Sequence, residues 1–124
     1  MAVSPLDPYF DAIDGGDVER TTAAFAEDAL YIRPSLEVPG ALDVVRGRDD
    51  LREFFRDRGK KPFRHHVRSF VVEGRECFAE GIAVEDEGGA VIASFLVHAS
   101  LDEDGRITRY FALMGGVPEG LDGS

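Results

Sequence analysis

The chain has 124 residues, a length that predicts one domain, 1–124, with its own hydrophobic core. Its formal net charge is −10, from 24 acidic and 14 basic residues. This balance disfavours nucleic acid and anionic membranes as partners, because both bind clustered Lys and Arg. No apolar stretch approaches the roughly 20 residues that a membrane span needs.

Two features bear on the cellular compartment. The single cysteine, Cys77, excludes an intramolecular disulfide and fits a reducing environment. The first residues lack the basic region and apolar run of a signal peptide. We therefore expect a cytoplasmic protein.

Three helices are predicted in the first half of the chain. Ser4 can cap the first, Pro5 suits its first turn, and Gly15 and Gly16 end it. Asp17 can cap a second helix that runs to about residue 27. A third is predicted over residues 49–58. The apolar residues that fall on the inner faces of these helices are Leu6, Tyr9, Phe10, Ile13, Val18, Phe25, Leu51, Phe54 and Phe55.

The segment between the second and third helices is less regular. Residues 30–32 predict a short strand that Pro34 ends. Residues 35–47 are predicted as a loop with a turn at Pro39 and Gly40, held down by apolar side chains. At the far end, residues 117–124 predict a flexible tail.

Residues 63–114 are the centre of the fold and predict four antiparallel strands. Glycine-containing turns at 73–75, 86–89 and 102–105 separate runs rich in Val, Ile, Phe, Ala and Leu. Helices that come first and a sheet that follows indicate an α+β fold. Three helices on a curved, mostly antiparallel sheet can form a cone with an apolar interior, which is a typical ligand site.

The strand around residue 80 divides by parity into two faces. Successive side chains point to opposite sides, so Phe78, Glu80 and Ile82 share one face, and a row of small residues from Cys77 to Ala83 shares the other. We expect the face with Glu80 to point into the cone. The next run, 91–99, is apolar on both faces and needs cover on both.

Four segments together resemble the cone-shaped superfamily of nuclear transport factor 2, which includes ketosteroid isomerases and SnoaL-like polyketide cyclases. They are residues 9–17, 25–29, 47–55 and 105–109, and the resemblance extends from Pro5 to Gly116. It implies a cystatin-like α+β barrel. It also implies binding of a small molecule, with isomerase, cyclase, dehydratase or hydrolase chemistry in some members.

The match to ketosteroid isomerase is partial. Tyr9 falls where that family has the tyrosine that hydrogen-bonds the substrate oxyanion. Arg33 falls where it has the general-base aspartate, and Val97 where it has a protonated aspartate. Residues 110–114 offer no carboxylate in the last strand. Steroid isomerisation by the family mechanism is therefore rejected.

Four polar residues are candidates for catalysis: Glu80, His65, Tyr9 and Arg33. An acid on an apolar face resists ionisation and can act as general acid or base, unless it is simply paired with an arginine. Arg33 can bind an anion or lie on the surface. Tyr9 can contact a ligand or donate to a backbone carbonyl within the core.

The three histidines have different expected roles. His65 and His66 are adjacent in a strand, so one faces inward and could exchange protons with Glu80 or Tyr9, or be hydrogen-bonded in place. His98 lies opposite in parity to Phe95 and Val97 and is expected to face away from the cone. The predicted ligand-lining residues are Phe55, Phe78, Ile82, Phe95, Val97 and Met114.

Two functions remain open. The first is a cofactor-free enzyme that does acid–base work on a small, largely apolar molecule, with no metal site, because the histidines and the cysteine lack ligand spacing. The second is a non-catalytic binding or assembly module, suggested by the missing family acids. In both, we expect a homodimer through the outer sheet face, where Ile92, Leu96 and the small-residue row need cover.

Overall fold

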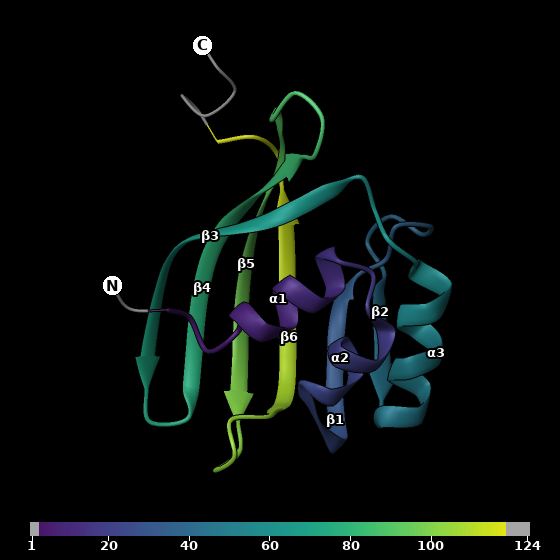
Figure 1. Ribbon diagram of the computed structural model, residues 1–124, viewed down its shortest axis with the longest axis vertical. Coiled ribbons are helices and arrows are strands. Elements are labelled where there is room, and N and C mark those ends of the chain that lie inside the picture. Colours follow the sequence, from purple (N-terminus) through teal and green to yellow (C-terminus); the bar gives the residue numbers. More distant parts are fainter. Residues whose placement is uncertain (1–2, 119–124) are drawn as a thin grey trace.

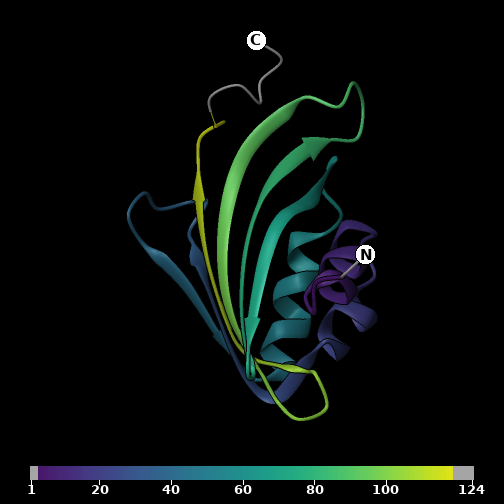
Figure 2. The ribbon, with the colours of Figure 1, turned by 90° about the vertical axis from the view of Figure 1, so that its left-hand side faces the viewer.

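The computed structural model describes residues 3–118, which form three helices and one six-stranded sheet of strand order β2-β1-β6-β5-β4-β3. The sheet curves strongly, and the helices lie on its concave side (Figures 1 and 2). This arrangement confirms the predicted α+β class. In chain order the elements are α1 (Asp7–Asp14), α2 (Val18–Ala23), β1 (Phe25–Pro34), β2 (Leu42–Arg46), α3 (Arg48–Arg58), β3 (Phe63–Glu73), β4 (Glu76–Glu85), β5 (Val91–Leu101) and β6 (Ile107–Gly115).

Helix α1 crosses the concave face of the sheet and buries its predicted side (Figure 1). It begins at Asp7, slightly later than the sequence suggested, and its N-cap position is Leu6 rather than the predicted Ser4. Ser4 Oγ accepts from the Leu6 amide at 3.1 Å, and Asp7 Oδ2 accepts from the Ser4 amide at 3.1 Å. Tyr9 and Phe10 are almost fully buried. These two hydrogen bonds stabilise the turn that precedes the helix.

Helix α2 starts as predicted but ends earlier. Asp17 Oδ1 accepts from the Arg20 amide at 3.0 Å. The helix stops at Ala23 rather than near residue 27, and β1 runs from Phe25 to Pro34, much longer than the predicted short strand. Burial explains the change: Phe25 is inaccessible to solvent, and β1 pairs parallel with β6. Tertiary pairing here outweighs local helix propensity.

Strand β2 corrects the prediction of a loop over residues 35–47. It pairs antiparallel with β1 at the sheet edge, with Val45 opposite Tyr31. Its apolar residues are largely on the outside, since Leu42 is 50% and Val44 62% exposed. A half-exposed edge strand carries a weak alternation pattern, which is why the sequence did not reveal it.

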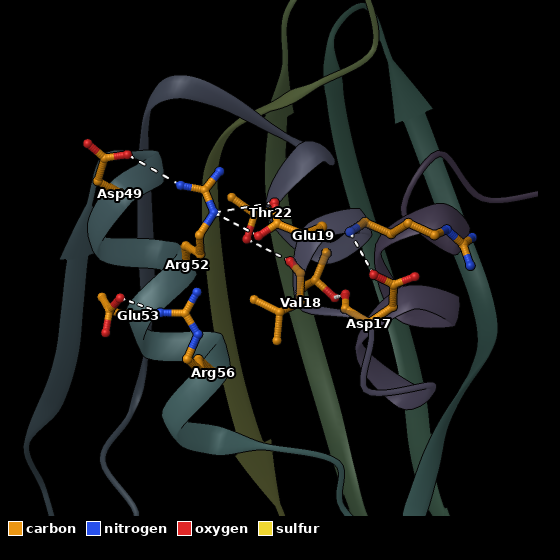
Figure 3. Close-up of polar contacts among 10 residues, drawn as sticks. Asp17, Val18, Glu19, Thr22, Asp49, Arg52, Glu53 and Arg56 are labelled. Atoms are coloured by element: carbon orange, nitrogen blue, oxygen red, sulfur yellow. Dashed lines mark hydrogen bonds and ion pairs between the residues drawn. The ribbon is translucent and has the colours of Figure 1, made fainter.

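Side chains at the surface join helix α3 to α2 (Figure 3). Arg52 Nε lies 3.1 Å from Glu19 Oε1 of α2, and Arg52 Nη1 lies 3.4 Å from Asp49 Oδ1. Because the Glu19 side chain is 71% exposed, such a pair contributes about 0–1 kcal/mol. The buried side of α3, Leu51 and Phe55, therefore carries most of its attachment, as the sequence predicted.

The start of α3 is also attached to β1 by partly buried hydrogen bonds. Strand β1 is irregular between Phe25 and Leu30, where its pairing register with β6 shifts. The Phe25 carbonyl accepts two hydrogen bonds from Arg48, from Nε at 3.0 Å and from Nη2 at 2.7 Å. Arg48 thereby satisfies a backbone oxygen beside the irregular stretch.

The four predicted strands, β3 to β6, are confirmed, but the assignment of faces on β4 is wrong. The small residues point inward: Cys77, Ala79 and Ala83 are buried in the concave side, while Phe78 is 50% exposed on the outer side. At Gly81, an added Cβ would clash with the His66 carbonyl and the Phe95 ring. Aromatic rings from neighbouring elements therefore fill the concave side, and only small residues on β4 leave room for them.

Residues 119–124, most of the predicted tail, lie outside the described residues. Within residues 3–118, no helix is long and apolar enough to cross a membrane.

Candidate functional site

A small cavity of about 60 Å³ lies in the cone, between α1, the end of α3 and the concave face of the sheet. Its polar lining combines hydroxyl, guanidinium and imidazole groups, and apolar side chains complete it. The lining residues are Tyr9, Ile13, Tyr31, Arg33, Arg58, His65, Ala83, Ala93, Ser94, Phe95, Tyr110, Ala112 and Met114.

Three tyrosines form one wall of the cavity. The hydroxyls of Tyr9 and Tyr31 are hydrogen-bonded at 3.0 Å, and the rings of Tyr31 and Tyr110 stack with centroids 4.8 Å apart. Burial raises the pKa of all three hydroxyls, most strongly for Tyr9 and Tyr110. The charge of Arg58 acts in the opposite direction on each pKa. The hydroxyls therefore stay protonated near neutral pH and can donate to a ligand oxygen.

His65 lines the cavity and is held by a carboxylate. Its Nδ1 lies 2.6 Å from Asp14 Oδ1, and its backbone amide donates to Asp14 Oδ2 at 2.8 Å. The ring packs against Phe10 and Phe95, with centroid distances of 4.9 and 5.4 Å. Since a carboxylate only accepts, Nδ1 carries the proton, and a neutral ring keeps Nε2 as an acceptor.

Two arginines lie where the cavity meets a second, more polar hollow of about 320 Å³. Arg33 stacks on Phe54 at 4.6 Å, and its Nε lies 3.4 Å from Asp43 Oδ2. Arg58 Nη1 donates to the Gly59 carbonyl at 3.1 Å. Both guanidinium groups line the cavity and this outer basin, which also includes Ser35, Leu36, Glu37, Asp57 and Lys61.

Three of the four candidate catalytic residues, Tyr9, His65 and Arg33, meet at the cavity. Glu80 does not, and its expected place inside the cone is wrong. It lies on the outer face, where Oε1 is 3.5 Å from Arg68 Nη1. It also lines an outer groove between β3 and β6. The parity error on β4 explains the difference, and the acid has no route to a ligand in the cone.

The other predicted residues, the histidines and the ligand-lining set, also lie partly at the cavity and partly elsewhere. Between the adjacent histidines, His65 faces the cavity and His66 is exposed. His98 faces away from the cone as expected, stacking on Phe78 at 4.4 Å. Of the predicted ligand-lining residues, Phe95 and Met114 line the cavity. Phe78 lines the outer groove instead, and Val97, a core residue, also borders that groove. Phe55 is buried in the core, and Ile82 is buried on the outer face of β4.

Sequence reasoning missed four site residues: Asp14, Tyr31, Tyr110 and Arg58. Asp14 and His65 are 51 positions apart and meet only because α1 packs across β3. Tyr31 and Tyr110 have a detectable feature, since each is a polar-tipped aromatic on an apolar strand face. Arg58 is one of several basic residues near the end of α3, and nothing local distinguishes it.

Comparison with known families decides the relationship. Residues 6–110 match the SnoaL-like domain. The chain belongs to the SnoaL-like domain family. A comparison with curated proteins gives no match.

Solved SnoaL-like and related structures share the fold. An Agrobacterium tumefaciens protein described as an isomerase of the SnoaL-like family has 18% identity and a TM-score of 0.71, covering 90% of this chain and 95% of that one. A Kribbella flavida protein described as a ketosteroid isomerase has 19% identity and a TM-score of 0.70, covering 95% and 90%. An epoxide hydrolase from M. tuberculosis has 16% identity and a TM-score of 0.68, covering 89% and 79%.

Proposed function

We propose that this SnoaL-like protein binds a small, largely apolar carbonyl compound in the cone cavity and transfers a proton next to the carbonyl, using its own side chains. The observation that carries the proposal is the His65–Asp14 pair on the wall that also presents the hydroxyls of Tyr9 and Tyr31. A base and hydrogen-bond donors in one small cavity are the parts that enolisation requires.

The proposed reaction uses His65 as the base. Nε2 takes the proton from the carbon next to the carbonyl, the C–H electrons form the C=C bond, and the carbonyl oxygen takes the negative charge. One of the hydroxyls of Tyr9 and Tyr31 donates to that oxygen and accepts the hydrogen bond of the other. Asp14 holds the ring and stabilises the imidazolium that forms. In a substrate whose enolate is conjugated with a C=C bond, return of the proton to the far end of that system moves the double bond and gives an isomer. In a substrate with a second carbonyl, attack of the enolate on its carbon gives a ring, and the imidazolium returns the proton to the new alkoxide.

This assignment fits the changes relative to ketosteroid isomerase. With Arg33 at the position of that family's base, the base in this chain has to come from another element, and His65 on β3 supplies one. Arg33 then adds positive charge beside the developing oxyanion. A positioned base accounts for about 10²- to 10⁴-fold in rate. Each oxyanion donor accounts for about 10²- to 10³-fold.

The test is deuterium exchange into small ketones. Butanone and 4-oxopentanoate are incubated with the protein in D₂O, and ¹H NMR follows the loss of signal from carbons next to the carbonyl. We expect His65→Asn to reduce the protein-dependent rate at least 100-fold, while the matched control His66→Asn keeps it. Equal exchange in both variants, or none with wild type, would contradict the proposal.

A second candidate function is assembly through the outer face of the sheet. We propose that a second copy covers it, because its exposed apolar residues adjoin charges that are already paired, Glu80 with Arg68 and Glu76 with His98. Such a face suits a self-complementary contact. The exposed residues are Val71, Phe78, Ile92, Leu96 and Leu113. The small-residue row is not among them, since it faces inward.

Sedimentation velocity at micromolar concentration tests the dimer. We expect wild type to sediment as a dimer and Leu96→Glu as a monomer, with Val44→Glu on edge strand β2 as the control. A wild-type monomer throughout this range would rule the dimer out.

A further inference from the structure

We propose that the ligand is a short monocarboxylate with a carbonyl group, whose carboxylate binds to Arg58 and Arg33 at the cavity mouth while its carbonyl reaches Tyr9 and His65. This deepens the proposed function and rests on it for the chemistry at the carbonyl. Three observations carry it: the volume of the cavity, the hydrogen bonds left free on the arginines, and the balance of charge in the outer basin.

The cavity limits the part of the ligand that enters. Its volume of about 60 Å³ is far below the roughly 150 Å³ of a cavity that holds benzene. It is further below the roughly 300–1,000 Å³ of common small-molecule sites. A few heavy atoms therefore fit beside the tyrosine hydroxyls. The rest of a ligand has to extend into the adjoining basin of about 320 Å³, past the two arginines that line both spaces.

The arginines at this junction differ in how far they are already bound. Arg33 is held between Phe54 at 4.6 Å and Asp43, whereas Arg58 lies over Phe63 at the longer distance of 5.9 Å. Among the residues that the structure describes, Arg58 has no carboxylate within 4 Å and donates one hydrogen bond, to Gly59. A guanidinium has five N–H donors in a planar fork that matches a carboxylate. Arg58 is therefore the main anchor, and Arg33 adds charge from a fixed position.

The charge of the basin selects against more highly charged ligands. Its three basic residues, Arg33, Arg58 and Lys61, are balanced by three acidic ones, Glu37, Asp43 and Asp57. A single carboxylate can bind between the two guanidinium groups. A dicarboxylate or a phosphate ester brings further negative charge toward the acidic side chains, and like charges at short range repel.

The position of the carboxylate also sets the length of the ligand. The arginines border the outer basin, and the tyrosines and His65 line only the inner cavity. Arg58 lines the same small cavity as the three tyrosines. A linker of one to three carbons between carboxylate and carbonyl fits this arrangement, as in 4-oxopentanoate.

The experiment compares 4-oxopentanoate with its uncharged amide, 4-oxopentanamide, by ¹⁵N–¹H NMR titration. We expect wild type to bind the acid at least tenfold more tightly than the amide. Arg58→Gln should remove this preference, and Arg58→Lys should keep part of it, because charge remains without the fork. Arg56→Gln, two positions earlier on the exposed side of α3, is the control and should leave the preference intact. Thermal melting checks that each variant is folded.

Equal affinity for acid and amide in wild type, or a full preference in folded Arg58→Gln, would overturn the inference. Tighter binding of succinate than of 4-oxopentanoate would do so too. The two proposals fail separately. Selective binding of the acid without deuterium exchange would leave the carboxylate site standing and remove the catalytic function. Deuterium exchange into butanone and 4-oxopentanamide at the same rate as into 4-oxopentanoate would leave the catalytic function standing and remove the carboxylate site.

Discussion

Replacing Asp14 by asparagine separates the position of the His65 ring from its chemistry. In the wild type, Asp14 accepts from the His65 backbone amide at 2.8 Å and from Nδ1 at 2.6 Å. The backbone N–H can only donate, so the side-chain oxygen of the introduced asparagine has to face it, and the side-chain NH₂ then faces the ring. Nδ1 can accept from this NH₂ only when the ring proton moves to Nε2, which removes the base from the cavity.

The expected loss of stability is small and the expected loss of activity large. The substitution replaces one hydrogen bond to a charged acceptor by a hydrogen bond between neutral groups. The side chains of His65 and Asp14 are 18% and 16% exposed. We expect a cost of about 1–2 kcal/mol. For a chain of this size, this corresponds to a fall in melting temperature of roughly 3–10 °C. The wrong tautomer should lower the exchange rate by about 10²- to 10⁴-fold.

Differential scanning calorimetry and the deuterium-exchange assay measure the two effects. Asp11→Asn, on the exposed side of the same helix, is the matched control and should change neither. An Asp14→Asn protein that exchanges at the wild-type rate would refute the role assigned to the pair.

Three further predictions concern the frame of the site. Gly81→Ala should destabilise the protein by about 1–3 kcal/mol in urea unfolding, because its Cβ meets backbone and a buried ring, whereas Gly116→Ala should have little effect. Arg48→Ala should cost about 1–3 kcal/mol by leaving a backbone carbonyl without its partners, while Arg52→Ala should cost less than about 1 kcal/mol, and equal losses would contradict this. Burial raises the pKa of all three tyrosines above that of the unfolded chain, so this stability is complete below about pH 10 and is lost as pH rises through the folded-state values. Absorbance at 295 nm should therefore show tyrosinate only together with unfolding, and three hydroxyls titrating near pH 10 in the folded protein would contradict it.

Local chemistry predicted most of the fold. The cap at Asp17, the apolar side of α1 and the glycine turns between β3 and β6 depend on neighbouring residues, and all are present. The end of α2 and strand β2 depend on pairing with distant strands. No local pattern encodes such pairing strongly, and these are the elements that the sequence placed wrongly.

The candidate site was harder because it depends on which face of β4 is inside. Large apolar residues beside Glu80 suggested an inner face, but in a curved sheet the small residues point inward when rings from elsewhere fill the space. Here Phe95 packs over Gly81. Tyr9, His65 and Arg33, three of the candidates, line the cavity, although the sequence left open which of His65 and His66 faces inward. Asp14, the partner of His65, could not be predicted, since the two are brought together only by packing of the whole fold.

The most direct test of the proposed catalytic role is the protonation of the His65 ring, measured by ¹⁵N NMR of histidine-labelled protein at a pH where the ring is neutral. We expect a proton on Nδ1 and an unprotonated Nε2 whose resonance shifts when 4-oxopentanoate is added, while the resonances of the His66 and His98 rings do not change. A proton on Nε2, or an Nε2 resonance that ignores the ligand, would contradict it.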